Sequence, residues 1–201
     1  MANVYTLKIT YQDCDNKIWR ETQVSSNSYL ADVGYIILAT FDTLAYHLFS
    51  ISFKDITFEL PNEDEDVLPE ECLFCVKLGQ LGAKVGDRLT MVYDFGCEQV
   101  FDIEITNIEP MSRGAGRAYQ KILRGEGRGI LDDVPAFETL EIIKDTDKNG
   151  TSTYTYFTKY ETEMVWDYRD YDIKCDNALL KAEIEQIAQG YSAFEAYLDF
   201  E

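Results

Sequence analysis

A change in the spacing of apolar residues constrains the fold of this chain more than any single motif does. Apolar and polar residues alternate over residues 4–11 and again over residues 17–24, which is typical of two half-buried strands. The four residues Asp13-Cys14-Asp15-Asn16 between them favour a turn. We therefore predict that the chain opens with a β-hairpin.

After Ser28 the apolar spacing becomes helical, with Leu30, Val33, Ile37 and Phe41 on one face. Ser28 is predicted to cap the N-terminus of this helix, because a serine hydroxyl accepts a hydrogen bond from a backbone amide in the first turn. A second helical pattern, one helix or two, covers residues 177–200 and contains Gly190.

The remaining patterns predict further short strands and loops. Strands are expected over residues 47–53 and 56–60, followed by an acidic loop over 61–71 and a segment at 76–81 that could be a short helix. Two more hairpins are predicted, one over 88–93 and 99–108 and the other over 138–144 and 152–159. We expect one α+β domain over residues 1–201, an antiparallel sheet of hairpins with an N-terminal-half helix and a C-terminal helix packed on it.

The chain is strongly acidic, and this limits its partners. Its 18 Lys and Arg against 37 Asp and Glu give a formal charge of −19 over 201 residues. Direct binding to nucleic acid is not expected, because such affinity comes mainly from cationic side chains. No apolar stretch approaches the roughly 20 residues that a membrane span requires, and the N-terminus runs straight into a strand pattern. We expect a cytoplasmic protein, with a protein partner as a possibility and no membrane association.

The five cysteines are an odd number and favour reduced thiols. Cys72 and Cys75 form the single close pair, which lacks the second pair of a structural zinc site. We interpret both as small buried apolar residues. No cofactor and no metal ligand set is predicted, and no catalytic residue is assigned.

Several separated motifs together resemble one protein family. They are Ile18-Trp19-Arg20, Leu30-Ala31-Asp32-Val33, His47-Leu48-Phe49, Tyr93-Asp94-Phe95-Gly96, Tyr119-Gln120-Lys121-Ile122-Leu123 and Gly125-Glu126-Gly127. In this order they resemble the plasmid pRiA4b ORF-3-like family over about residues 4–135, which leaves 136–201 as a C-terminal hairpin and helical extension. The resemblance implies an α+β protein whose molecular function is unsettled.

The chain also departs from the family pattern. The family's Asp-Phe-Gly motif usually continues with an acidic residue, Trp and His, where this chain has Cys97, Glu98, Gln99 and Phe101. Ile130-Leu131-Asp132-Asp133 stands where a Pro-Pro-Glu-Asp type of segment is common. If the family has a site, the retained positions should converge on one candidate cleft of Trp19, Arg20, His47, Asp94 and Glu126.

Four of these five residues also have a structural interpretation. Trp19 is expected in the core, Arg20 in a bidentate pair with Asp94 or another carboxylate, and His47 in a structural hydrogen bond. Asp94 and Glu126 could form a carboxylate pair for acid–base or metal chemistry. Asp94 could equally accept hydrogen bonds from the amides of its own turn.

Positive charge is concentrated in one glycine-rich segment, residues 109–135. We regard it as a candidate binding loop with five cationic side chains, Arg113, Arg117, Lys121, Arg124 and Arg128. Gly125, Gly127 and Gly129 lack the residues of a phosphate loop and are interpreted as flexible loop positions.

Asp145, Asp147, Asn149 and Gly150 copy the first half of a calcium-binding loop. Tyr156 occupies the twelfth position, where the loop needs a bidentate glutamate. A polar hairpin turn is therefore the preferred interpretation.

Three functions remain. The first is a non-catalytic module that binds a protein partner through aromatic and acidic residues. The second is an acidic mimic of nucleic acid that occupies a DNA-binding protein. The third is a metal-dependent hydrolase using Asp94, Glu126 and His47. Binding is favoured over catalysis.

Overall fold

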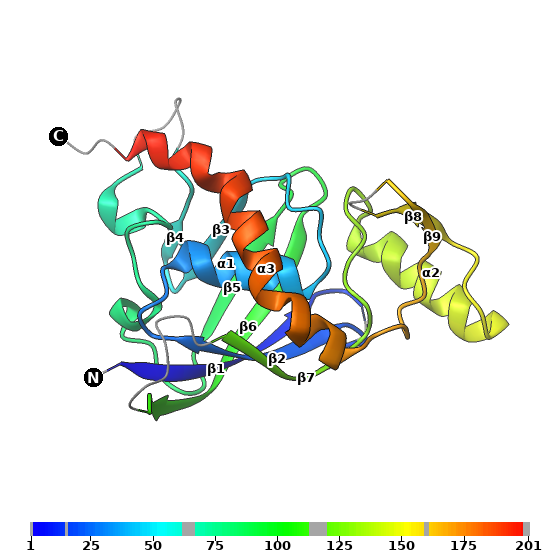
Figure 1. Ribbon diagram of the computed structural model, residues 1–201, viewed down its shortest axis with the longest axis horizontal. Helices are drawn as coiled ribbons and strands as arrows, with labels where there is room; N and C mark the ends of the chain where they lie inside the picture. The colour runs from blue at the N-terminus through cyan, green and yellow to red at the C-terminus, as the bar shows by residue number, and fades with distance from the viewer. Residues whose placement is uncertain (1, 15, 62–66, 113–119, 159–160, 199–201) are drawn as a thin grey trace.

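The fold is centred on a seven-stranded sheet in which every pair of neighbouring strands is antiparallel (Figure 1). The computed structural model describes residues 2–14, 16–61, 67–112, 120–158 and 161–198. The sheet has the order β4-β3-β5-β6-β1-β2-β7. Its strands are β1 (Asn3–Tyr11), β2 (Trp19–Ser25), β3 (Phe49–Phe53), β4 (Ile56–Phe58), β5 (Arg88–Tyr93), β6 (Gln99–Pro110) and β7 (Gln120–Glu126).

The predicted hairpins β1–β2 and β5–β6 are confirmed, with Thr10 opposite Trp19 in the first and Leu89 opposite Ile103 in the second. The strands β3 and β4 also lie within the predicted ranges, and the ambiguous segment at 76–81 contains the 3-10 helix η2 (Leu78–Leu81). A further 3-10 helix, η1, occupies Pro69–Glu71 in the predicted acidic loop. Alternation identified these strands because one face of each packs on the core.

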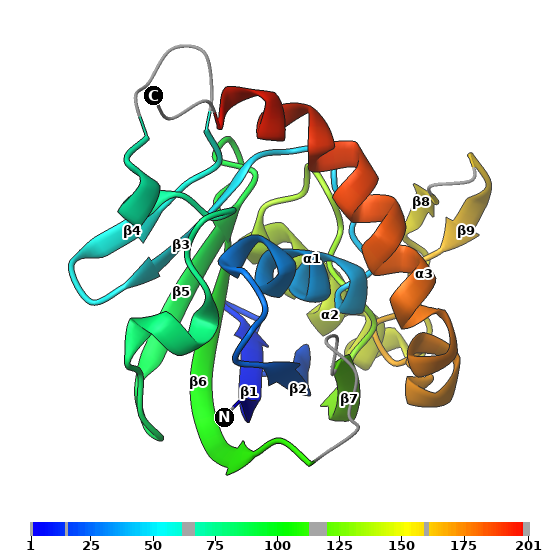
Figure 2. The same cartoon turned by 60° about the vertical axis from the view of Figure 1, so that its left-hand side comes forward.

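Two helices form the layers above the sheet, so the predicted α+β class is confirmed. Figure 2 shows α1 (Leu30–Thr40) lying between the curved sheet and α3 (Ile173–Tyr191). The α3 helix continues into the 3-10 helix η3 (Ser192–Tyr197). Nine of the eleven residues of α1 are buried, as expected for a helix enclosed on both sides.

The predicted N-cap of α1 is wrong by one residue. Tyr29 occupies the cap position, and its backbone N–H donates to Asp32 Oδ2 at 2.8 Å. In a capping box, the side chain of the third helical residue accepts the backbone N–H of the cap residue, and Asp32 has this role here. Ser28 is buried before the helix, and its N–H donates to the carbonyl of Ser25.

Residues 120–126 form the strand β7, although the glycine-rich sequence predicts a loop there. It pairs with β2 at one edge of the sheet. The outer edge of β7 is partly closed by Asn177 of α3. Its Oδ1 accepts the N–H of Ile122 at 3.0 Å, and its Nδ2 donates to the Ile122 carbonyl at 2.9 Å.

The predicted third hairpin is also wrong, because its first strand lies in the helix α2 (Ala136–Asn149). Two short strands, β8 (Thr155–Phe157) and β9 (Glu163–Val165), form a separate antiparallel pair beside α2 (Figure 1). The buried residues Thr139, Ile143 and Thr146 of α2 have helical spacing.

The calcium-like run therefore ends a helix and does not form a hairpin turn. Gly150 follows Asn149 in the left-handed conformation at φ 76°, and its N–H donates to the carbonyl of Thr146 at 2.9 Å. This is the usual glycine stop of an α-helix. Asp147 accepts hydrogen bonds from Lys17 and Tyr168, so its carboxylate is used within the protein.

Within the described ranges, no helix combines the length and the apolar composition that crossing a membrane would require. The five cysteines are free thiols.

Gly34 and Gly190 offer a matched test of helix packing. A Cβ at Gly34 in α1 would stand 2.2 Å from Cε2 of Phe49, whereas a Cβ at Gly190 in α3 would meet nothing within 4 Å. We expect Gly34→Ala to lower the free energy of unfolding by about 2 kcal/mol through overpacking. Gly190→Ala should raise it by about 0.5–1 kcal/mol through helix propensity.

Urea denaturation of both variants measures these changes. A Gly34→Ala protein as stable as the parent would show that α1 does not approach β3 this closely.

Candidate functional site

Arg20 is a buried guanidinium that joins three parts of the fold. Arg20 as a whole is 1% exposed. Nε donates to the carbonyl of Thr40 at the end of α1, and Nη1 donates to the carbonyls of Trp19 and Glu126, each at 2.9 Å. The predicted bidentate pairing with Asp94 or another carboxylate is wrong, because these donors are directed at backbone carbonyls.

Two aromatic rings enclose the same guanidinium. Its Cζ lies 3.8 Å from the ring centroid of Tyr171 and 5.0 Å from that of Phe41. Burial lowers the pKa of Arg20, and the nearby Tyr171, Asp176 and Asp42 oppose that change. The cation is therefore stabilised by carbonyl dipoles, aromatic faces and more distant carboxylates.

The glycines beside Arg20 are close-packed, contrary to their interpretation as flexible loop residues. A Cβ at Gly125 would lie 2.9 Å from Cδ of Arg20, and one at Gly129 would lie 1.8 Å from the carbonyl oxygen of Phe41. Gly127 has φ 76°, and its Cβ would meet the carbonyl of Lys17 at 2.3 Å. These glycines allow backbone segments to touch.

Trp19 and Glu126 face each other across β2 and β7 in the register of the sheet. Trp19 is half-buried and Glu126 is exposed, so the prediction that Trp19 fills the core is wrong. The amine of Lys8 lies 5.8 Å from the Trp19 ring. Trp166, which is 1% exposed, is the tryptophan of the core.

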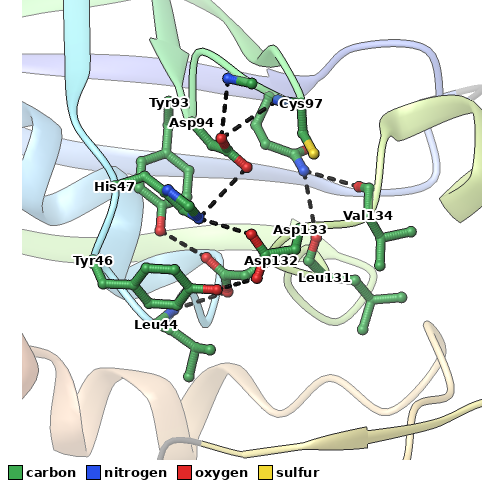
Figure 3. A network of polar contacts seen from close by, with 12 residues as sticks. Leu44, Tyr46, His47, Tyr93, Asp94, Cys97, Leu131, Asp132, Asp133 and Val134 are labelled. Carbon is green, nitrogen blue, oxygen red and sulfur yellow. Dashed lines mark hydrogen bonds and ion pairs between the residues drawn. The ribbon is translucent and has the colours of Figure 1, made fainter.

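His47 and Asp94 form a second group of the candidate residues, together with Asp133 (Figure 3). Nε2 of His47 lies 3.0 Å from Oδ1 of Asp133 and 3.6 Å from Oδ2 of Asp94. The predicted structural hydrogen bond of His47 is thus present, and its partner is Asp133. Glu126 is not part of this group.

Asp94 shapes the turn after β5, as one of its two interpretations expected. It adopts φ 55°, and its Oδ1 accepts the N–H groups of Gly96 at 3.1 Å and Cys97 at 3.4 Å. The second oxygen, Oδ2, is buried and has no hydrogen-bond partner among the described residues. Half of this carboxylate therefore serves the turn, and half faces His47.

Asp132 and Asp133 complete the network and were not selected from the sequence. Asp132 accepts the hydroxyl of Tyr93 at 2.7 Å and the N–H of Leu44 at 2.9 Å, while Asp133 accepts the hydroxyl of Tyr46. Burial raises the pKa of Asp132, and these two donors oppose the rise. The sequence contains one sign of their importance, because these two acids stand where the family commonly has a Pro-Pro-Glu-Asp type of segment.

A cavity of about 740 Å³ lies among the end of α1, the segment after β7, the β8–β9 pair and the start of α3. Arg20 and Asp133, the latter from the cluster around His47, both line it. Its acidic lining consists of seven carboxylate residues, Asp42, Asp132, Asp133, Asp170, Asp172, Asp176 and Glu183. Two cations, Arg20 and Arg128, line it as well.

The structure separates the residues of the predicted binding loop. Arg113 and Arg117 lie outside the described residues, and Lys121 and Arg124 are exposed positions of β7. Arg124 binds both carboxylate oxygens of Glu21, at 3.1 and 2.6 Å. Arg128 donates to the hydroxyl of Tyr156 and lies 3.6 Å from Asp42. Its described members are therefore split between a strand and the cavity.

The structure favours the apolar interpretation of the cysteine pair. Cys72 is fully buried and Cys75 is half-buried. Burial and the neighbouring Cys72 raise the pKa of the Cys75 thiol to about 11, so this side chain is a neutral thiol in the protein by itself.

Arg20→Lys tests whether the planar guanidinium matters. Lysine keeps the charge but cannot make the same forked hydrogen bonds or stack on Tyr171. We expect a loss of about 2 kcal/mol in the free energy of unfolding, from the lost hydrogen bonds to buried carbonyls. Urea titration measures it, with Arg88→Lys on the exposed face as control, which should change stability by less than about 0.5 kcal/mol. Equal stabilities of the two variants would contradict this role for Arg20.

Comparisons with known proteins agree with the fold and identify the family. A solved structure, the protein of unknown function MM3350 from Methanosarcina mazei Go1, superposes with a TM-score of 0.65 at 21% identity, covering 88% of this chain and 97% of the other. This likeness concerns the fold. No curated protein matches the chain.

The family model described as plasmid pRiA4b ORF-3-like protein matches residues 3–176. The match extends past the motifs at 4–135 through α2 and the β8–β9 pair to the first turn of α3. The chain belongs to the plasmid pRiA4b ORF-3-like family.

Proposed function

We propose that this protein is a non-catalytic binding module whose cavity receives a basic, partly apolar segment of a partner protein. The observation that carries the proposal is the cavity of about 740 Å³, because acidic and apolar side chains line it together. A volume of this size is typical of ligand sites in proteins.

The charge of the lining favours a cationic ligand. Seven acidic residues line the cavity against two arginines. Both arginines are already engaged within the protein, Arg20 with backbone carbonyls and Arg128 with Tyr156. An incoming cation would therefore meet an excess of carboxylates, which favours attraction and orientation of a basic segment.

Part of the apolar lining is open to solvent. Four large apolar residues of the cavity are more than a third exposed, Leu44 at 36%, Phe157 at 65%, Met164 at 43% and Leu179 at 49%. Grouped exposed apolar side chains commonly mark an interaction site. The aliphatic stems of lysine and arginine can cover such surface while their charged ends reach carboxylates.

The proposed setting is the cytoplasm, which is consistent with five free thiols. The net charge of −19 also leads us to propose that the module does not bind nucleic acid directly.

A peptide of alternating leucine and arginine, labelled with a fluorophore, is a direct probe of the cavity. We expect it to bind, and we expect Asp176→Asn to weaken binding by about tenfold, because one charge of the lining is lost. Glu185→Gln is the matched control, since Glu185 lies on the same helix, is exposed and does not line the cavity. Fluorescence anisotropy measures both affinities.

Equal weakening by Asp176→Asn and Glu185→Gln would show that the peptide senses only the overall charge and would contradict a cavity site. A peptide of leucine and glutamate, and a DNA duplex, should not bind.

Asp176 also predicts a pH dependence of folding. Burial raises its pKa to about 6 from the ordinary aspartate value of 3.8, with Arg20 opposing the rise and Asp42, Glu183 and Asp172 adding to it. The folded state therefore holds this proton more tightly than the unfolded state does. The resulting stabilisation is complete below about pH 4 and is lost as the pH rises through about 6.

At pH 7 we therefore expect Asp176→Asn to be more stable than the parent by about 1 kcal/mol, a value reduced for partial solvent exposure. Thermal unfolding from pH 4 to pH 7 measures the difference, which should shrink toward the acidic end. A constant difference across this range would contradict the pKa assignment.

A further inference from the structure

We propose that His47, Asp94 and Asp133 bind one divalent transition-metal ion. This site goes beyond the binding of a basic segment and does not depend on it. One imidazole nitrogen and one oxygen from each carboxylate lie within 4.8 Å of one another. They come from the segment before β3, the turn after β5 and the segment before α2 (Figure 3).

The separations suit the coordination sphere of a small ion. Nε2 of His47 stands 3.0 Å from Asp133 Oδ1 and 3.6 Å from Asp94 Oδ2. Ligand atoms about 2.0–2.2 Å from a tetrahedral zinc ion are about 3.3–3.6 Å apart. The two distances to His47 Nε2 bracket this range, and the two carboxylate oxygens lie within 4.8 Å of each other. Side-chain movements of about 1 Å would therefore bring all three atoms to a zinc ion.

The buried oxygen of Asp94 is an independent indication of a ligand. Asp94 is 5% exposed, and its Oδ2 has no hydrogen-bond partner among the described residues. Its neighbour His47 Nε2, at 3.6 Å, is too distant for a hydrogen bond. An anionic oxygen left without a donor in a buried site is costly, and a metal ion between the three side chains would satisfy it.

The surroundings hold all three side chains in place. The His47 ring packs against Tyr46 at 4.2 Å and edge-on against Tyr93 at 5.6 Å between ring centroids. Asp94 is fixed by its turn, and the second oxygen of Asp133 accepts the Tyr46 hydroxyl. Such outer contacts orient the ligands of metal sites.

The chemistry of the ligands indicates the class of ion. One imidazole and two carboxylates suit zinc or manganese, whereas magnesium and calcium prefer oxygen ligands alone. The Asp133 side chain is 63% exposed and the His47 side chain 26% exposed, so a further coordination position can be reached from solvent. Asp133 also lines the cavity, which places the proposed ion beside it.

The single histidine of the chain provides a specific readout. In a proton–carbon NMR spectrum of the purified protein, the imidazole of His47 gives one set of signals. We expect stoichiometric Zn²⁺ to shift these signals and to saturate. Zinc held by the thiols of Cys72 and Cys75 would leave them unmoved, and that result would overturn the proposal.

Asp94→Asn is the most informative variant. The asparagine Oδ1 can still accept the turn amides of Gly96 and Cys97, while the ligand oxygen is replaced by an amide nitrogen. We expect the Zn²⁺ affinity at His47 to fall by more than about tenfold, the lower end of the loss seen when an outer contact is removed. Asp133→Asn should have the same effect and is exposed, so folding should tolerate it.

Asp55→Asn in the exposed turn between β3 and β4 is the matched control and should leave the affinity unchanged. Affinity retained in both Asp94→Asn and Asp133→Asn would overturn the proposal. The peptide-binding experiment with Asp176→Asn uses different residues, so failure of one proposal is distinguishable from failure of the other.

Discussion

The hydrogen bonds of the buried Arg20 guanidinium hold together the elements that form the cavity. The guanidinium joins β2 to β7 through the carbonyl of Glu126, and it binds the carbonyl of Thr40 at the last residue of α1. A helix C-terminus carries partial negative charge and favours a cation. This arrangement compensates a charge whose burial would otherwise be costly, and it fixes the end of α1, Tyr171 and the edge of the sheet around one side of the cavity.

The parts of the fold that follow a clear apolar period could be predicted from the sequence. The strands of the opening hairpin alternate apolar and polar residues, and α1 and α3 repeat apolar residues at helical spacing over two or more turns. Each of these elements buries one face, which is the cause of the repeat. The strand β7 could not be identified in this way, since its charged and glycine residues obscure the alternation. In α2 the run ending at Gly150 resembled a hairpin turn, because glycine serves equally at turns and at helix ends.

The sequence identified several residues of the candidate site but not the groups that they contact. The family motifs selected Arg20, His47 and Asp94, but the partners of Arg20 are backbone carbonyls, which leave no mark in a sequence. The partner of His47 is Asp133, which lies 86 positions away and is brought near by the fold. Trp19 and Glu126 offer their carbonyls to Arg20, and neither residue belongs to the cluster of His47, Asp94 and Asp133.

The side chain of Asn177 has a consequence for the whole molecule. By offering both an acceptor and a donor to Ile122, its amide imitates the backbone of one more strand at the outer edge of β7. Exposed sheet edges invite pairing with another chain, and this is a route to aggregation. One carboxamide carried by a helix thus works against edge-to-edge pairing of sheets between neighbouring molecules at high concentration.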